Sequence, residues 1–159
     1  MTSRPAISVP TEVLVAPDVF ASDGVRDELS AQAVAEALRS GLAASGMPAR
    51  VSTLADPEHD AQMRAALAVV TGTGRLDRGS LVGTVLAEVA TRARQAGVPC
   101  HAVVGENALD LFDMRILDLQ LVLEAGTLDE IEAAGAELGA EIQRQRSASP
   151  GKPPAGWSS

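Results

Sequence analysis

The sequence predicts an α/β domain built on a mostly parallel sheet. Short β-rich runs alternate along the chain with segments whose apolar residues recur at helical spacing, a pattern typical of strand–helix–strand units. A length of 159 residues leaves room for one domain with a substantial core, but not for two ordinary domains. We therefore expect a single three-layer domain with right-handed crossovers.

Each element is placed by its own pattern. Runs rich in β-branched and apolar residues predict the strands, at residues 13–16, 50–54, 67–71, 99–104 and 119–123. Apolar residues at helical spacing predict helices or helical turns at residues 31–45, 58–66, 79–96 and 107–117. Thr127 and Glu130 form a capping box that starts the last helix. This order of elements indicates a flavodoxin-like or Rossmann-like domain.

Changes in composition mark both ends of the domain. Residues 1–11 are polar and contain Pro, so we expect a flexible lead-in there. Residues 147–159 are rich in Ser, Pro and Gly, which predicts a disordered tail. The α/β domain is therefore assigned to residues 12–146. Within it, Ser22-Asp23-Gly24 predicts a turn in the loop after the first strand.

Composition also argues against several classes of partner. A formal charge of −8 disfavours nucleic acid and anionic membranes, which need a basic face. No stretch approaches the roughly 20 apolar residues of a membrane-spanning helix. The N-terminal residues lack the long apolar segment of a signal peptide. Since the one cysteine, Cys100, has no partner for an internal disulfide, we expect a soluble cytoplasmic protein.

The most informative stretch is residues 67–83, which read LAVVTGTGRLDRGSLVG. An apolar run followed by Gly72 and Gly74 predicts a buried strand that stops at a tight turn. Asp77 then stands where the N-cap of the next helix is expected. A strand, a Gly-rich turn and a helix N-terminus together present backbone N–H groups to an anion.

Two interpretations of these glycines stay open, because neither the P-loop nor the dinucleotide fingerprint is complete. In one, Gly72, Thr73, Gly74 and Arg75 bind a phosphate or carboxylate. In the other, the glycines supply only positive φ and close helix packing. Arg75 likewise either clamps a phosphate or pairs with a neighbouring acid.

Acids and glycines follow several predicted strands. Ligands of open parallel sheets bind beyond the carboxyl ends of the strands. In this chain those ends carry Asp18, Asp56, residues 71–77 and Gly105-Glu106. We therefore expect a small-anion or nucleotide site at that edge of the sheet.

Three stretches resemble the type-one glycerate kinases, a bacterial family that phosphorylates D-glycerate with ATP. The family's opening motif is similar to Ala16-Pro-Asp-Val-Phe20, which is followed here by a Leu-Ser-Ala helix start. Its later motif, Thr-Gly-Glu-Gly-Arg-Leu-Asp, is similar to residues 71–77, and the end of its sequence is similar to Ala96-Gly-Val-Pro99 and the Thr127 helix. The resemblance covers most of residues 13–145.

The resemblance implies ATP with Mg²⁺ as the phosphoryl donor and a small hydroxy acid as the acceptor. It implies that Asp18, Asp56 and Asp77 handle the metal or the hydroxyl, while Gly72 to Arg75 and Gly105 receive phosphate. For the chain itself we expect no separate metal site. Each carboxylate also has a simpler interpretation: Asp18 and Asp56 as turn residues, and Asp77 as a helix cap.

The departures from the family are also informative. Family members are more than twice as long, with a second domain inserted near residues 57–66 of this chain. Ala21, Thr73 and Thr84 stand where the family has a lysine, a glutamate and a lysine. Because phosphoryl transfer depends on positioning and charge neutralisation, we expect a truncated member with weak or absent kinase activity. The alternative is a regulatory or interaction domain, as a homodimer or bound to a separate chain, and an exposed apolar face would favour it.

The remaining chemistry-bearing residues are interpreted as structural. His101 lies on a predicted strand, and Cys100 lacks the grouping that a nucleophile needs. His59 is expected on a surface helix, where one histidine beside two acids makes a weak metal site. Two further sets complete the expectations: a solvated acidic face of Asp110, Asp113 and Asp118, and core fillers Met47, Met63 and Met114.

Overall fold

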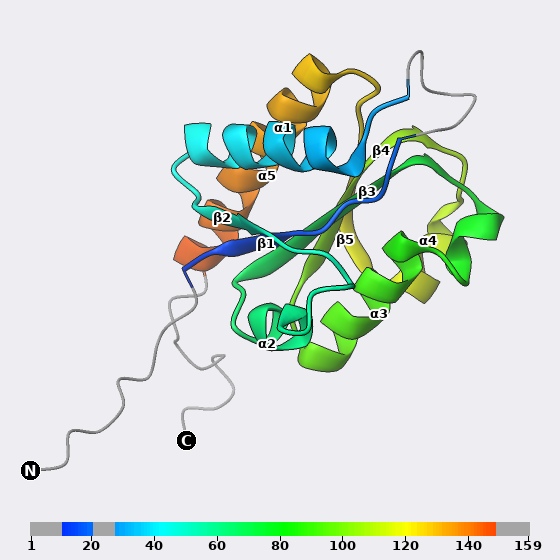
Figure 1. Cartoon of the computed structure of the whole chain (residues 1–159), viewed down its shortest axis with the longest axis horizontal. Coiled ribbons are helices and arrows are strands. Elements are labelled where there is room, and N and C mark those ends of the chain that lie inside the picture. The colour runs from blue at the N-terminus through cyan, green and yellow to red at the C-terminus, as the bar shows by residue number, and fades with distance from the viewer. Residues whose placement is uncertain (1–10, 21–27, 149–159) are drawn as a thin grey trace, which may run out of the picture.

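A computed structural model describes residues 11–20 and 28–148 of the chain (Figure 1). Five strands form one parallel sheet in the order β2-β1-β3-β4-β5. The strands are β1 (Val13–Val15), β2 (Ala49–Val51), β3 (Ala68–Leu76), β4 (Cys100–Asn107) and β5 (Leu119–Glu124). The helices are α1 (Ala31–Ala44), α2 (His59–Arg64), α3 (Val85–Ala96), α4 (Leu111–Leu117) and α5 (Leu128–Ala148), with a short 3₁₀ helix η1 (Arg78–Leu81).

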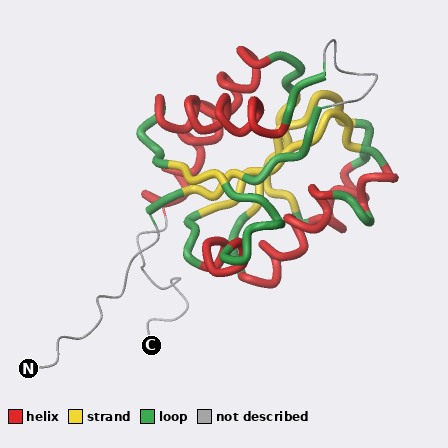
Figure 2. The backbone as a smooth tube through the Cα atoms, in the orientation of Figure 1, coloured by secondary structure: helices red, strands yellow, loops and turns green. Residues whose placement is uncertain are grey.

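Helices cover both faces of the sheet, as the layers in Figures 1 and 2 show. Alternate residues of each strand enter different cores, as the two-residue period of a strand requires. Val13 and Val15 enter the core beneath α1 and α5, whereas Leu14 enters the core on the α3 side. The three-layer α/β fold expected from the sequence is therefore confirmed. The strand order changes direction between β1 and β3, which is where such sheets bind ligands.

Two strands are longer than the sequence suggested, and this corrects the interpretation of the glycine-rich stretch. β3 continues through Gly72 and Gly74 to Leu76, paired with β4 as far as Asn107. Neither glycine has a positive φ, which among described glycines belongs to Gly46, Gly83 and Gly97. The predicted tight turn at Gly72 and Gly74 is therefore wrong.

Close packing explains one of these glycines. A Cβ at Gly72 would overlap the carbonyl oxygen of Val103 on β4 and lie 3.3 Å from the ring of Phe20. Phe20 is fully buried, so it has little room to move away. The glycine lets a strand and an aromatic side chain pack closely. The sequence had suggested a positive φ and close helix packing instead.

The ends of the helices are set by side-chain caps. Thr84, not Asp77, caps α3: its Oγ1 accepts a hydrogen bond from the Ala87 N–H at 3.1 Å. The capping box of α5 is confirmed, because the Glu130 N–H donates to Thr127 Oγ1 and the Thr127 N–H donates to the Glu130 carboxylate, both at 3.2 Å.

The structure describes only a small part of the predicted lead-in and of the predicted C-terminal tail. α5 continues to Ala148, so residues 147 and 148 of the predicted tail are helical. The remainder of that tail, the lead-in at residues 1–10 and the turn at Ser22-Asp23-Gly24 lie outside the described residues. Across the stretches that the structure describes, no helix combines the length and apolar character needed to cross a membrane.

α1 and α5 pack directly on each other, and glycines make this close approach possible. A Cβ at Gly41 would overlap the carbonyl oxygen of Glu132, and a Cβ at Gly135 would lie 2.8 Å from the carbonyl oxygen of Leu38. Backbone atoms cannot yield as flexible side chains do, so the two helices would have to separate.

We predict that Gly41→Ala destabilises the domain by about 1–3 kcal/mol, although alanine is the better helix former. Urea unfolding followed by circular dichroism measures this difference. Gly126→Ala is the matched control, because its nearest contact would be the Glu130 carboxylate at an ordinary 3.8 Å. Equal stability of the two variants would contradict the packing argument.

Candidate functional site

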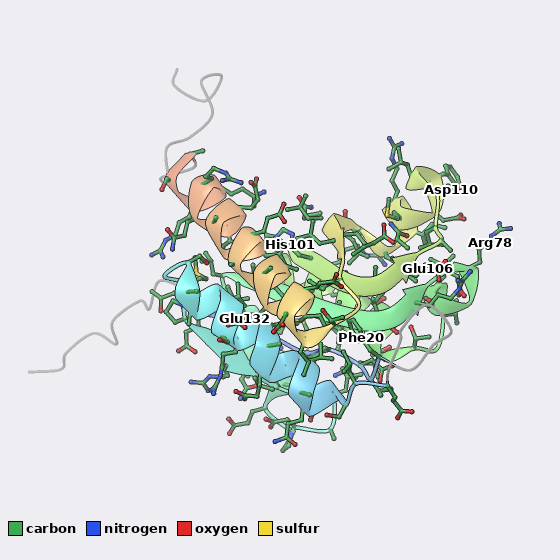
Figure 3. All side chains as sticks on the ribbon, turned by 90° about the horizontal axis from the view of Figure 1, so that it is seen from above. Phe20, Arg78, His101, Glu106, Asp110 and Glu132 are labelled. Atoms are coloured by element: carbon green, nitrogen blue, oxygen red, sulfur yellow. The ribbon has the colours of Figure 1, made fainter. Side chains whose placement is uncertain are left out.

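The carboxyl edge of the sheet is uneven, because β3 and β4 extend past β1 and β2. The β1 chain follows β3 only as far as Asp18, whose N–H donates to the Gly72 carbonyl at 2.8 Å. Beyond that level β3 and β4 pair alone, with Arg75 opposite Glu106 and Leu76 opposite Asn107. The tip of this two-stranded extension lies at one end of the molecule, where Figure 3 labels Arg78, Glu106 and Asp110.

Arg75 joins two carboxylates at this tip. Its Nε lies 3.1 Å from Asp77 Oδ2, and its Nη1 lies 2.7 Å from Glu106 Oε2. The hydrogen bonds to Asp77 and then to Glu106 raise the pKa of the guanidinium. Of the two interpretations of Arg75, pairing with neighbouring acids is the one that the structure shows. Its Nη2 has no hydrogen-bond partner among the described residues.

A small turn holds the tip in place. The Asp77 N–H donates to Ser80 Oγ at 3.0 Å, and the Ser80 hydroxyl donates to the Arg75 carbonyl at 3.2 Å. Asp77 therefore caps η1, whereas a cap on α3 had been expected. Sequence reasoning missed Ser80, although its place three residues after Asp77 is the spacing of a capping pair.

The other two candidate carboxylates lie apart from this tip. Asp18 Oδ1 accepts a hydrogen bond from the Val19 N–H at 2.7 Å, at the level of Gly72. Asp77 is five residues farther along the β3 chain, roughly 16 Å away at the rise of an extended strand. Asp56 Oδ1 accepts from the Glu58 N–H at 2.9 Å, at the entrance to α2.

The structure therefore does not bring Asp18, Asp56 and Asp77 together as one cluster. In the described part of the chain, no three acidic, histidine or cysteine side chains are grouped so that they could hold a metal ion. The candidate phosphate-binding residues all lie in paired, extended strands: Gly72, Thr73, Gly74 and Arg75 in β3, and Gly105 in β4.

Both histidines are buried. His59 is in the core, where its Nδ1 lies 2.9 Å from Ser52 Oγ, so the expected surface position is wrong. Burial, and secondarily Arg92, lowers the pKa of His59. His101 lies on β4 beneath α5 (Figure 3), and neither of its ring nitrogens has a hydrogen-bond partner within the part of the chain that the structure describes. Burial lowers the pKa of His101 to about 4.

The other residues interpreted as structural give a mixed outcome. Burial raises the pKa of Cys100 to about 12, which keeps its thiol protonated and unreactive. Met47 and Met63 are core residues, as expected. The solvated acidic face is wrong in part: Asp110 caps α4, and Asp113 is buried with a 3.5 Å ion pair to Arg78.

We predict that His101 makes the fold sensitive to acid. The folded chain keeps this ring neutral, whereas the unfolded chain binds a proton below about pH 6.5. The free energy of unfolding therefore has its full value above pH 6.5 and decreases as the pH falls toward 4. At pH 5 it is about 2 kcal/mol lower than at neutral pH.

Urea unfolding between pH 7.5 and 5 measures the effect, with His101→Leu as the comparison. Leucine removes no hydrogen bond to a described residue, because neither ring nitrogen has a partner there. The variant should lose about 2 kcal/mol less than the native chain over this range. His59 is present in both proteins, so both should keep the same remaining dependence of the free energy of unfolding on pH. If the free energies of the two proteins changed with pH in parallel, His101 would not be the source of the acid sensitivity.

The sheet order and the covering helices define a flavodoxin-like α/β domain. Solved structures agree: a diflavin flavoprotein A3 from Nostoc sp. has a TM-score of 0.52 and 16% identity, over 89% of this chain and 99% of that one. A flavodoxin-like domain from Synechococcus sp. has a TM-score of 0.51 and 16% identity, over 86% and 99% of the two chains. At such low identity the likeness shows the fold alone.

No curated protein matches the sequence. Residues 53–138, however, match the model of the glycerate kinase family. Because these residues are more than half of the chain, the chain belongs to the glycerate kinase family. The matched region includes Asp56, the Gly72 to Asp77 stretch and Gly105. Asp18 lies before it.

Proposed function

We propose that this chain is a glycerate kinase-family domain that binds a small phosphate- or carboxylate-bearing ligand, such as ATP with Mg²⁺, at the carboxyl edge of its sheet. We further propose that its phosphorylation of D-glycerate is weak or absent. The proposal that the chain binds an anion rests on the contacts of the Arg75 guanidinium. Asp77 and Glu106 hold its Nε and Nη1, and Nη2 has no partner among the described residues.

A guanidinium held in this way is suited to binding. Its orientation is fixed before the ligand arrives, so less conformational entropy is lost when a phosphate or carboxylate accepts hydrogen bonds from Nη2. Arg75 lies on β3, one of the two strands at the change in strand order, and at the carboxyl edge where sheets of this class bind ligands. It is three residues beyond Gly72, the level that the β1 chain reaches. The two carboxylates keep the guanidinium charged and limit its rotation.

The charge of the edge suggests how an anion is bound. One arginine lies between two carboxylates, and the whole chain carries a formal charge of −8. This field repels a free polyphosphate strongly, whereas it repels a polyphosphate that already carries Mg²⁺ less, because the metal cancels two of the negative charges. Because the described residues offer no grouped set of metal ligands, we propose that Mg²⁺ enters with the nucleotide.

Weak catalysis is supported by what stands at the family's charged positions. Thr84, at the position of a family lysine, is used as the cap of α3 and donates its hydroxyl to the Ser80 carbonyl at 2.8 Å. Thr73, at the position of a family glutamate, has no carboxylate to offer. Phosphoryl transfer depends on charged groups that neutralise the developing charge. Binding without appreciable turnover is the expected consequence.

We predict that ATP with Mg²⁺ raises the midpoint of thermal unfolding, and that ATP alone raises it much less. A ligand at 100 times its Kd stabilises the native state by about 2.7 kcal/mol. Arg75→Gln should weaken binding by about tenfold or more, since a hydrogen bond to a charged group contributes about 1.5–3 kcal/mol. D-glycerate is tested alone and with ATP and Mg²⁺.

Arg64→Gln is the control, because it removes the same guanidinium group from α2, away from the carboxyl edge. Arg64 is exposed, whereas Arg75 is half-buried. The Arg64→Gln variant should keep the native shift. A coupled assay for ADP release tests the second part, and turnover at the rate of an ordinary kinase would contradict it. No shift with any ligand would contradict binding and would favour the interaction domain instead.

A further inference from the structure

The outer side of α4 is an exposed apolar surface. Leu111 and Phe112 have 75% and 74% of their surface exposed, and Ile116 has 50%. Phe112 is one of only two phenylalanines in an aromatic-poor chain, and the other, Phe20, is fully buried. Exposed aromatic residues within an apolar patch mark surfaces that bind other molecules.

The neighbouring segment adds to this surface. η1 contacts α4, and Val82, directly after η1, has 83% of its surface exposed. The inner side of α4 is occupied, since Leu117 is buried and Met114 packs against the same core. α4 is therefore packed against the core through its inner side, and its exposed apolar residues lie on the opposite side. They form a second face with nothing covering it among the described residues.

Charges at the two ends of this face indicate what covers it. Asp110, exposed, is the N-cap of α4, and Arg115, also exposed, lies in its last turn. When two copies of α4 pack antiparallel about a two-fold axis, Asp110 of each lies next to Arg115 of the other. The same arrangement sets Leu111 against Ile116 and places the Arg115 guanidinium over the Phe112 ring of the other copy.

We propose that α4 and the adjoining Val82 form the interface of a homodimer. The face is self-complementary where Asp110 at one end meets Arg115 of the other copy, with apolar side chains between. The exposed C-cap Asp118 also lies at the Arg115 end and opposes this attraction. Self-complementarity is what a two-fold interface requires, because the same patch must fit itself. The antiparallel arrangement also places each positive helix end beside the negative end of its neighbour.

A dimer formed through α4 does not depend on ligand binding at the carboxyl edge, because Arg75 takes no part in the proposed contact. A dimer without ligand binding and ligand binding without a dimer are distinguishable results. Sedimentation velocity detects the dimer, and the thermal shift detects the ligand.

The test is sedimentation velocity of the full chain between about 1 and 200 μM, with three variants. We expect a reversible monomer–dimer equilibrium. Phe112→Glu should raise the dimer Kd by roughly 30-fold or more, as for a central interface residue. Arg115→Glu, which sets two acids against each other, should also raise it. Asp110→Asn keeps the cap and removes the charge, so it should weaken the dimer less.

Two controls match these changes in charge and exposure. Leu128→Glu places a carboxylate on a partly exposed leucine of α5, in the other helix layer. Arg64→Glu makes the same charge reversal on α2. Both should dimerise as the native chain does, and circular dichroism checks that each variant is folded. A chain that is monomeric at 200 μM, or a dimer that Phe112→Glu leaves intact, would overturn the proposal.

Discussion

The pairing of β3 with β4 beyond the ends of β1 and β2 is the constraint on which the rest of the structure depends. It requires Gly72, because any Cβ there would overlap the Val103 carbonyl and press on Phe20. It then carries Arg75 and Glu106 to opposite positions of the ladder, so their ion pair is a consequence of strand register. The turn that follows places Asp77 on the other side of the same guanidinium. One backbone feature therefore builds the whole charged tip.

The sequence predicted the fold well, because the fold depends on patterns that repeat over many residues. Alternating strands and helices, the cap at Thr127 and the buried methionines all follow from local composition and spacing. The strand ends were less predictable. Gly72 and Gly74 indicate a turn when they are interpreted alone, and only the partner strand β4 makes the extended conformation the favourable one. His59 shows the same limit: its neighbours Glu58 and Asp60 suggest a surface, but its ring contacts Ser52 in the core.

The sequence predicts the edge of the sheet on which a site is expected, but it does not predict how the candidate side chains are arranged there. The carboxyl ends of parallel strands meet at one edge, so Asp18, Asp56, Arg75 and Gly105 were expected near that edge, and their role in binding stays a prediction. The lengths of the strands decide which of these side chains contact one another, and the sequence does not specify those lengths. Asp56 instead supports the entrance to α2. Arg75 finds both of its partners on the extension, which makes the site a fixed cation between acids. It is not a cluster of three carboxylates.

The same extension explains why one face of α4 is left uncovered by residues 11–20 and 28–148. Since β4 continues to Asn107, the chain turns at the far tip, where Asn107 Oδ1 accepts a hydrogen bond from the Leu109 N–H at 3.1 Å. α4 therefore begins at the end of the domain, beside η1, and only its inner side meets α3. Among the described elements, none lies over the outer side of this helix to bury Leu111, Phe112 and Ile116. A protein that keeps such residues exposed loses solubility unless another surface covers them. The ordered ion pair at the tip and the apolar face beside it are thus two results of one long strand pair, and each is suited to a different kind of binding.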